Sequence, residues 1–292
     1  MTDAQPQNLF QRHRRNAARL DERDVVIAGY PASGSALLGN ILIELGLGYV
    51  DPYTEEVKAD GTTAVVGDLV DFRHRLAATA ARDHGQLAGD AAAEDEPRFF
   101  RNHLYPEHFD HDRLGGAVLL VRDPRDAVYS SYKFFNRFAP RLLPDRLKGQ
   151  GTFAEFLDDV GINEEPPVEG WTGFCRSWHT ALPGFRRSAV VRFEDLKADP
   201  EAATAALLTA FGVTRTPEAI ARATGRSSYD RMRAHEEKVS AVHDATGADG
   251  PRIMRRGKVG EWREWYGDER LAARFREPGL TETAALFGYA LT

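Results

Sequence analysis

The sequence predicts an α/β fold of three layers, in which helices cover both faces of a mainly parallel central sheet. A pattern that occurs twice leads to this prediction. Short apolar runs at residues 25–28 and 117–121 are each followed by turn-forming residues and then by a segment of helical character. Strands that alternate with helices along a chain are joined by crossover connections, and these connections make neighbouring strands parallel.

The first strand, loop and helix have the layout of an anion-binding P-loop. Residues 25–28 form a brief β-branched run closed by Gly29, and apolar residues recur at helical spacing across 34–46. The glycines of the intervening loop, Gly29 and Gly34, let the backbone turn tightly and approach a ligand. Unpaired N–H groups at the helix start, with about half a positive charge from the dipole, favour a phosphate or sulfate there. A turn whose glycines serve packing alone has the same pattern.

This loop differs from the P-loop of nucleotide triphosphatases at two positions. Gly29 and Gly34 have the G-x-x-x-x-G spacing, but Ser35 and Ala36 stand where that motif has Lys and Ser or Thr. The chain therefore lacks both the amine that reaches the phosphates and the hydroxyl that binds magnesium. This argues against ATP or GTP hydrolysis and leaves a P-loop-type small-molecule kinase as a remote alternative.

The remaining elements follow in order along a chain long enough for one large domain. We expect residues 1–22 to form an N-terminal arm or short helix, and residues 23–292 to form a single domain. Further strands are predicted at 98–103 and 189–193. Helices are predicted at 68–82, 124–138, 152–159, 172–182, 201–211 and 217–224, with a loop at 85–97 and a basic, polar tail region after 224.

Composition excludes several classes of function. The net charge of −6, from 38 basic and 44 acidic residues, gives no general attraction to nucleic acid or to an anionic membrane. The single cysteine, Cys175, excludes an internal disulfide and a multi-thiolate metal site. The sequence has no apolar run near the ~20 residues of a membrane span, and its polar N-terminus has no apolar signal core. We therefore expect a cytoplasmic protein.

Six stretches, in order along residues 24 to 265, resemble the signature stretches of the sulfotransferases that use 3′-phosphoadenosine 5′-phosphosulfate (PAPS). Any one of them is weak evidence, but all six occur at family-like spacing. They are Tyr30-Pro31-Ala32-Ser33-Gly34-Ser35, Arg101-Asn102-His103-Leu104, Arg122-Asp123-Pro124-Arg125-Asp126 with Ser130, Arg192-Phe193-Glu194-Asp195-Leu196, Ser227-Ser228-Tyr229 with Met232, and Arg255-Arg256-Gly257-Lys258-Val259-Gly260-Glu261-Trp262.

The resemblance implies transfer of a sulfuryl group from PAPS to a hydroxyl, or an amine, of a small-molecule acceptor, with release of adenosine 3′,5′-bisphosphate (PAP). It implies that His103 is the general base. From the chemistry of the residues we expect Arg101 to stabilise charge on the sulfuryl oxygens, and we expect no metal, because a sulfuryl group has less charge to neutralise than a phosphoryl group and no carboxylate cage is evident. A homodimer is compatible with the resemblance. The implied nucleotide-binding residues are Tyr30, Pro31, Ala32, Ser33, Gly34, Ser35, Ala36, Leu37, Arg122, Ser130, Phe193, Ser228, Tyr229, Met232, Arg255, Arg256 and Gly257.

These residues also make physical sense, because PAPS needs two anion sites about one nucleotide apart. The first loop supplies one site from its N–H groups, and arginines far apart in the sequence supply the other through planar donor pairs. Considered alone, Arg122 is compatible with a salt bridge at a strand end, Arg255 and Arg256 with a solvated basic run, and His103 with a packed residue. The interpretation requires Arg122 and Arg255 to lie beside the loop at 33–35.

One departure from the family concerns the chemistry directly. Ala32 stands where the first loop of the family has a basic residue, usually Lys. Three explanations remain open: another cation, from Lys133, Lys58 or Arg101, takes over the role; the protein binds the nucleotide without efficient transfer; or Ala32 is an introduced substitution. A second departure is Leu37, where the family often has an aromatic residue beside the adenine.

Overall fold

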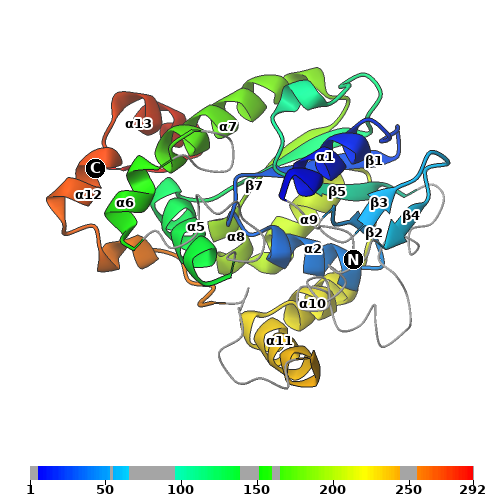
Figure 1. The fold of residues 1–292 in the computed structure, drawn as a ribbon. Coiled ribbons are helices and arrows are strands. Elements are labelled where there is room, and N and C mark those ends of the chain that lie inside the picture. The colour runs from blue at the N-terminus through cyan, green and yellow to red at the C-terminus, as the bar shows by residue number, and fades with distance from the viewer. Residues whose placement is uncertain are drawn as a thin grey trace.

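The structure is a computed structural model that describes residues 6–52, 55–65, 96–138, 151–159, 165–243 and 255–291. Its centre is a five-stranded sheet in the order β2-β5-β1-β6-β7, and every neighbouring pair in it is parallel (Figure 1). The strands are β1 (Asp24–Gly29), β2 (Gly48–Val50), β5 (Arg98–Asn102), β6 (Gly116–Val121) and β7 (Ser188–Arg192). A separate antiparallel hairpin joins β3 (Glu55–Val57) to β4 (Thr63–Val65).

Helices pack on both faces of this sheet. They are α1 (Pro6–Ala17), α2 (Ser35–Glu44), α5 (Pro124–Phe138), α6 (Phe153–Asp158), α7 (Pro167–Ala181), α8 (Phe193–Ala198), α9 (Pro200–Ala210), α10 (Pro217–Arg226), α11 (Tyr229–His243), α12 (Glu269–Arg274) and α13 (Pro278–Ala285), with short 3₁₀ turns at Pro106–His108, Leu182–Gly184 and Glu261–Glu264.

Alternate residues of β1 enter two different cores. Val25 and Ile27 belong to a buried cluster with Leu38 of α2, whereas Val26 and Ala28 belong to a cluster with Trp171 of α7. A strand that is buried on both faces must be apolar throughout, and this is why residues 25–28 form an uninterrupted apolar run. The predicted three-layer α/β fold with a mainly parallel sheet is confirmed.

The predicted strands at 25–28, 98–103 and 117–121 are present within one residue or so at each end, as is the helix at 124–138. Two boundaries were wrong. Phe193 does not end a strand but starts helix α8, and α7 begins at Pro167 rather than at 172, because a proline is well suited to the first turn of a helix.

Other elements escaped prediction because they are short or polar. Strand β2 and the β3–β4 hairpin have three residues per strand, which is too few for a periodic pattern. The region after 224, predicted as a polar tail, contains α11, α12 and α13. The helix predicted at 68–82, and the loop predicted at 85–97 as far as residue 95, lie outside the described residues.

The N-terminal segment contains a helix that is docked on the hairpin. Asn16 of α1 is fully buried; its side-chain amide donates to the Glu55 carbonyl at 3.1 Å and its oxygen accepts the Val57 N–H at 2.9 Å. The Asn16 side-chain amide thus pairs with the backbone of β3 in the way that a neighbouring strand would. Of the two alternatives for this segment, the short helix is the one observed, and the division of the chain near residue 22 stays a prediction.

Candidate functional site

Four segments of the site begin where parallel strands end. The first loop follows β1, His103 follows β5, Arg122 follows β6 and Phe193 follows β7. The carboxyl ends of parallel strands meet at one edge of a sheet, where α/β proteins bind their ligands. The sheet therefore gathers residues that are up to 160 positions apart in the chain.

The loop after β1 turns through two residues in the left-handed region. Ala32 has φ +64° and Gly34 has φ +106°. A side chain at position 34 could not be accommodated, since its Cβ would lie 2.5 Å from the Phe193 ring. Ser33 between them is fully buried, and within the described residues its Oγ makes no hydrogen bond. The turn thus presents a buried hydroxyl and the unpaired N–H groups at the start of α2.

Three hydrogen bonds fix the conformation and position of this loop. Ser33 N–H donates to the Tyr30 carbonyl at 3.1 Å, the Tyr30 hydroxyl donates to the Pro167 carbonyl at 3.0 Å, and Ser131 Oγ donates to the Pro31 carbonyl at 3.1 Å. Ser131 was not predicted, and the predicted Ser130 is its half-buried neighbour on α5. Beyond the loop, Ser35 is buried, whereas Ala36 and Leu37 are half-buried on the first turn of α2.

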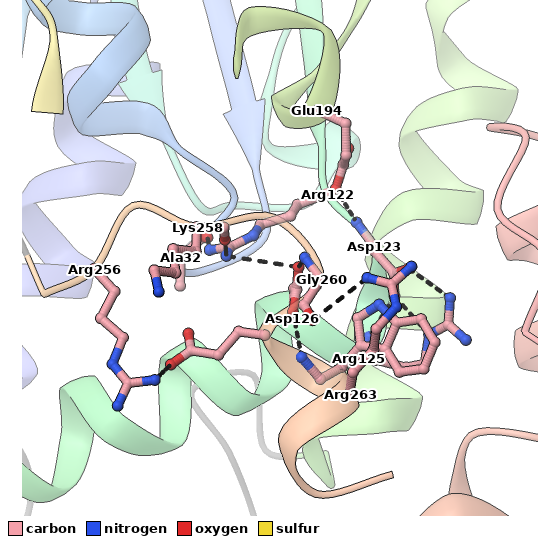
Figure 2. A network of polar contacts seen from close by, with 12 residues as sticks. Ala32, Arg122, Asp123, Arg125, Asp126, Glu194, Arg256, Lys258, Gly260 and Arg263 are labelled. Carbon is pink, nitrogen blue, oxygen red and sulfur yellow. Dashed lines mark hydrogen bonds and ion pairs between the residues drawn. The ribbon is translucent and has the colours of Figure 1, made fainter. Parts of the chain in front are cut away.

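Arg122 connects this loop to a segment from the far end of the chain. Its guanidinium donates to the Ala32 carbonyl at 3.0 Å and to the Lys258 carbonyl at 2.9 Å (Figure 2). It also lies 4.4 Å above the Phe193 ring. The residue is only 6% exposed, and within the described residues its Nε makes no hydrogen bond. The ion pair of Arg122 with Asp126 is long, at 3.9 Å, so the guanidinium donates mainly to the two carbonyl oxygens and not to a strand-end carboxylate.

Asp126 fixes the C-terminal segment against helix α5. Its carboxylate accepts the Gly260 N–H at 2.7 Å and the Trp262 N–H at 2.9 Å (Figure 2). Together with the bond from Arg122 to Lys258, these contacts lay the segment across the start of α5. The first loop, Arg122 and the C-terminal segment thus lie together, as the two-anion-site interpretation requires.

The two arginines at the start of that segment are held by carboxylates. Arg255 makes a two-pronged ion pair with Glu261, and Arg256 pairs with Glu264 at 2.7 Å. Although burial works against ionisation, Arg255 and Arg256 hold the pKa of Glu261 below its usual value. Arg255 is half-buried and so does not belong to a solvated basic run, whereas Arg256 is exposed; the sequence pattern gave no sign of their carboxylate partners.

The residues predicted around the adenine lie on and before α11. The Tyr229 hydroxyl donates to the Arg255 carbonyl at 2.7 Å, and its ring fills the space beside Gly257, where a Cβ would lie 2.7 Å from the ring. Met232 is buried and Ser228 is exposed. Asn40 of α2, which was not predicted, donates to the Ser227 hydroxyl at 2.9 Å and ties this region to the helix that follows the first loop.

His103 is held in one tautomer by its neighbours. Its Nδ1 lies 2.6 Å from the Gly29 carbonyl oxygen, which can only accept, so Nδ1 carries the proton. Its Nε2 lies 3.4 Å from a guanidinium nitrogen of Arg101, which can only donate, so Nε2 presents a lone pair. Arg101 is paired with Asp51 at 3.0 Å. Burial, followed by the charge of Arg101, lowers the pKa of His103 to about 3, and the imidazole is neutral.

Of the three candidate cations, only Arg101 has a recorded contact with His103. Lys133 lies over the rings of Tyr129 and Tyr132, at 5.1 and 5.0 Å from their centroids. Lys58 is exposed in the turn that joins β3 to β4. Arg101, by contrast, touches the nitrogen that presents the lone pair.

The described residues contain neither a candidate membrane-spanning helix nor a candidate metal site. Among the described helices, none combines the length and the apolar character that crossing a bilayer requires. Within the same residues, no group of three or more His, Cys, Asp or Glu side chains is arranged to hold a metal ion.

Comparison with known proteins places this geometry in a family. Residues 22–277 match the family described as sulfotransferase domain. Sulfotransferase 6B1 of Pan troglodytes is 25% identical over 192 residues, which cover 62% of this chain and 57% of the relative, so this match spans little more than half of the relative's length. Sulfotransferase 1E1 of Rattus norvegicus is 23% identical over 263 residues, covering 87% of this chain and 81% of the relative.

Solved structures have the same fold. Retinol dehydratase in a complex with retinol and PAP superimposes with a TM-score of 0.61 at 17% identity, covering 95% of this chain and 86% of that one. A mouse sulfotransferase complexed with PAP gives a TM-score of 0.57 at 16% identity, covering 96% and 94% of the two chains. The family match extends over most of the sequence and includes every segment of the site described above, so the chain belongs to the sulfotransferase domain family.

Proposed function

We propose that the protein transfers a sulfuryl group from PAPS to a hydroxyl group of a small-molecule acceptor. The observation that carries the proposal is the position of Arg122, which bonds both the first loop and the C-terminal segment while its Nε remains available. Buried polar atoms without a protein partner are costly, and the two anionic ends of one bound PAPS molecule would satisfy Ser33 Oγ and this Nε separately.

The nucleotide would be held at both ends. Ser33 and the N–H groups at the start of α2 would receive the 5′-phosphosulfate, and Arg122 would receive the 3′-phosphate. Arg255 and Arg256 would share their ion pairs with that phosphate. The remaining contacts to the sugar and adenine would come from Leu37, Phe193, Ser130, Ser228, Tyr229, Met232 and Gly257.

His103 would act as the general base through Nε2. The acceptor oxygen attacks sulfur and forms the new S–O bond, the bond from sulfur to the bridging oxygen breaks, and the electron pair leaves with PAP. The acceptor proton passes to Nε2 of His103, while the Gly29 carbonyl holds the opposite nitrogen. A bound phosphosulfate would offset the charge of Arg101 and raise the pKa of His103 toward the range useful for a base.

We propose that the acceptor has an apolar body. Tyr105 follows the His103 segment and is half-buried, with its ring packed 5.6 Å from that of the core residue Phe174, so it can offer an aromatic surface beside the proposed base. Retinol dehydratase, which shares the fold, has been solved with retinol and with androsterone, both apolar alcohols. A homodimer remains a prediction.

The decisive experiment combines binding with turnover. We expect PAP to bind in calorimetry with a Kd in the micromolar range or below, which corresponds to a binding free energy of about −8 kcal/mol or more negative. Labelled PAPS should then transfer its sulfuryl group to at least one member of a panel of hydroxylated apolar metabolites. Absence of PAP binding would overturn the nucleotide assignment. Binding without transfer to any acceptor would instead support a nucleotide-binding protein with altered chemistry, the alternative that Ala32 motivates.

The variant Ala32→Lys tests which cation serves the reaction. Because Arg101 contacts the proposed base, it would lie close to the sulfuryl group that the acceptor attacks, and we expect Ala32→Lys to change kcat by less than tenfold. The control is Ala32→Met, which adds similar length without charge at the same left-handed position. A gain of ~10²- to 10³-fold for Lys alone, the range for restoring one missing donor in a dry site, would show that Arg101 does not replace the family Lys.

A further inference from the structure

His13 of helix α1 lies beside the proposed general base. Its ring is nearly parallel to that of His103, with centroids 6.3 Å apart and an angle of 21° between the planes. Offset aromatic pairs commonly have this separation. His13 is 3% exposed, and it lies outside the six stretches that resemble the family. Nothing in the proposed reaction so far uses this side chain.

The position of His13 is fixed by the docking of its helix. His13 lies three residues before Asn16 and four before Ala17, so all three are on one face of α1, and all three are buried. Asn16 is bonded on both sides to the backbone of β3, and Arg19 donates to the Val57 carbonyl. Because α1 is docked on β3 in this way, the backbone that carries His13 is held in place.

The charged groups around the two rings come from four elements. Arg12 belongs to α1, Arg101 belongs to β5, and Asp51 follows β2 and pairs with Arg101. On β3, Glu55 accepts the Asp51 N–H at 2.8 Å, and Glu56 pairs with Arg15 of α1 and with Arg19, which follows that helix. Burial, followed by the charges of His103, Arg101 and Arg12, holds the pKa of His13 well below its usual value. His13 is thus a neutral neighbour.

We propose that His13 is a positioning residue for His103: its planar neutral ring keeps the imidazole of the general base in the plane that directs Nε2 toward the acceptor. The inference rests on the proposed function. Rotation of the His103 ring would break the bond from Nδ1 to the Gly29 carbonyl and would turn the lone pair of Nε2 away. A neighbouring planar ring resists that rotation, and because it stays neutral it adds no charge to oppose the imidazolium that forms.

The test compares two substitutions of His13 in the full chain. His13→Ala should lower kcat by about tenfold or more, with unchanged KM for PAPS and unchanged Kd for PAP, because small misplacements of a catalytic group have large effects on rate. His13→Phe, which keeps a planar ring, should stay within about threefold of the parent kcat. The matched control is Arg15→Ala, which removes an exposed ion pair of the same helix and should leave kcat unchanged.

A readout independent of turnover is the titration of the His103 ring, followed by NMR. In the parent chain and in His13→Phe the ring should stay neutral well below pH 6; in His13→Ala water reaches the ring and its pKa should rise. If His13→Ala does not fold, His13→Leu, which fills the volume without a plane, takes its place: kcat should fall as expected for Ala, while the His103 titration stays at the parent value because water is still excluded. Parent values of kcat and titration in the Ala variant, or a parent kcat in the Leu variant, would overturn the proposal, as would a Phe variant as impaired as Ala at the parent melting temperature.

Failure of this inference and failure of the proposed function are distinguishable. If the parent chain transfers no sulfuryl group, the function fails, while the NMR titrations still report whether His13 controls the His103 ring. If the parent chain is active and binds PAP, but the His13 variants match it in kcat and titration, only the positioning role is wrong.

Discussion

His103→Gln is expected to lower kcat by ~10²- to 10⁴-fold, the usual contribution of general base catalysis, with little change in PAP affinity. A glutamine can accept the bond from Arg101 but cannot take a proton from the acceptor. The rate should be measured with saturating PAPS and the best acceptor from the panel, and PAP binding by calorimetry. His108→Gln, at a half-buried histidine in the turn Pro106–His108, is the matched control and should keep the parent rate. Parent turnover in folded His103→Gln would remove this residue from the mechanism.

The buried histidine also predicts how stability depends on pH. The pKa of His103 is about 3 in the folded protein, below the ordinary value near 6.5 of the unfolded chain, so the unfolded state takes up a proton first as pH falls. The free energy of unfolding should therefore be highest above pH 6.5. It should decrease as pH falls from 6.5 toward 3, by up to about 1.4 kcal/mol per pH unit for this group. Urea denaturation at pH 7 and pH 5 measures the slope, which should be smaller in His103→Gln.

Arg122→Met is expected to weaken PAP binding by ~10²- to 10³-fold or more. Hydrogen bonds to charged groups contribute about 1.5–3 kcal/mol each, and a phosphate accepts two from one guanidinium. The substitution also removes the bonds to the Ala32 and Lys258 carbonyls, so the C-terminal segment loses a tie to the first loop. Calorimetry with PAP measures the loss in affinity, and thermal denaturation without nucleotide measures the structural part.

Two further variants test whether the loss of PAP affinity is specific to the guanidinium of Arg122. Arg122→Lys keeps the charge without the planar fork and should be intermediate in affinity. Arg263→Met removes an arginine that stacks on Trp262, 4.5 Å from the ring centroid, at the same C-terminal segment, and should bind PAP like the parent chain. If Arg122→Met bound PAP as tightly as the parent, the 3′-phosphate would have to be held elsewhere.

The parts of the fold that could be predicted are those in which one local pattern determines the outcome. Residues 25–28 and 117–121 are buried on both faces of the sheet and are therefore apolar throughout, a signal that needs no partner. The three-residue strand β2 exists only because β5 lies beside it. Likewise Pro167 suggests a break in the chain when considered alone, although it forms the first turn of α7 once that helix can pack on β6.

The candidate site also has residues that could be predicted from the sequence and residues that could not. Residues whose chemistry matches a local motif, such as Arg122 and His103, could be proposed from the sequence. Their partners could not, because backbone carbonyls such as those of Ala32 and Lys258 are present at every position and are selected only by the fold. His13 escaped for a related reason: a lone histidine in a polar helix is unremarkable until the docking of the helix brings it to the base.

The route of the C-terminal segment across helix α5 has a consequence for biosynthesis. Arg122 obtains its second carbonyl from residue 258, and Asp126 obtains its two N–H donors from residues 260 and 262. A ribosome must therefore have completed most of the polypeptide before these contacts can form. If the proposed donor pocket is correct, products shortened by interrupted translation, or by proteolysis near residue 255, are expected to bind PAPS more weakly than the full chain.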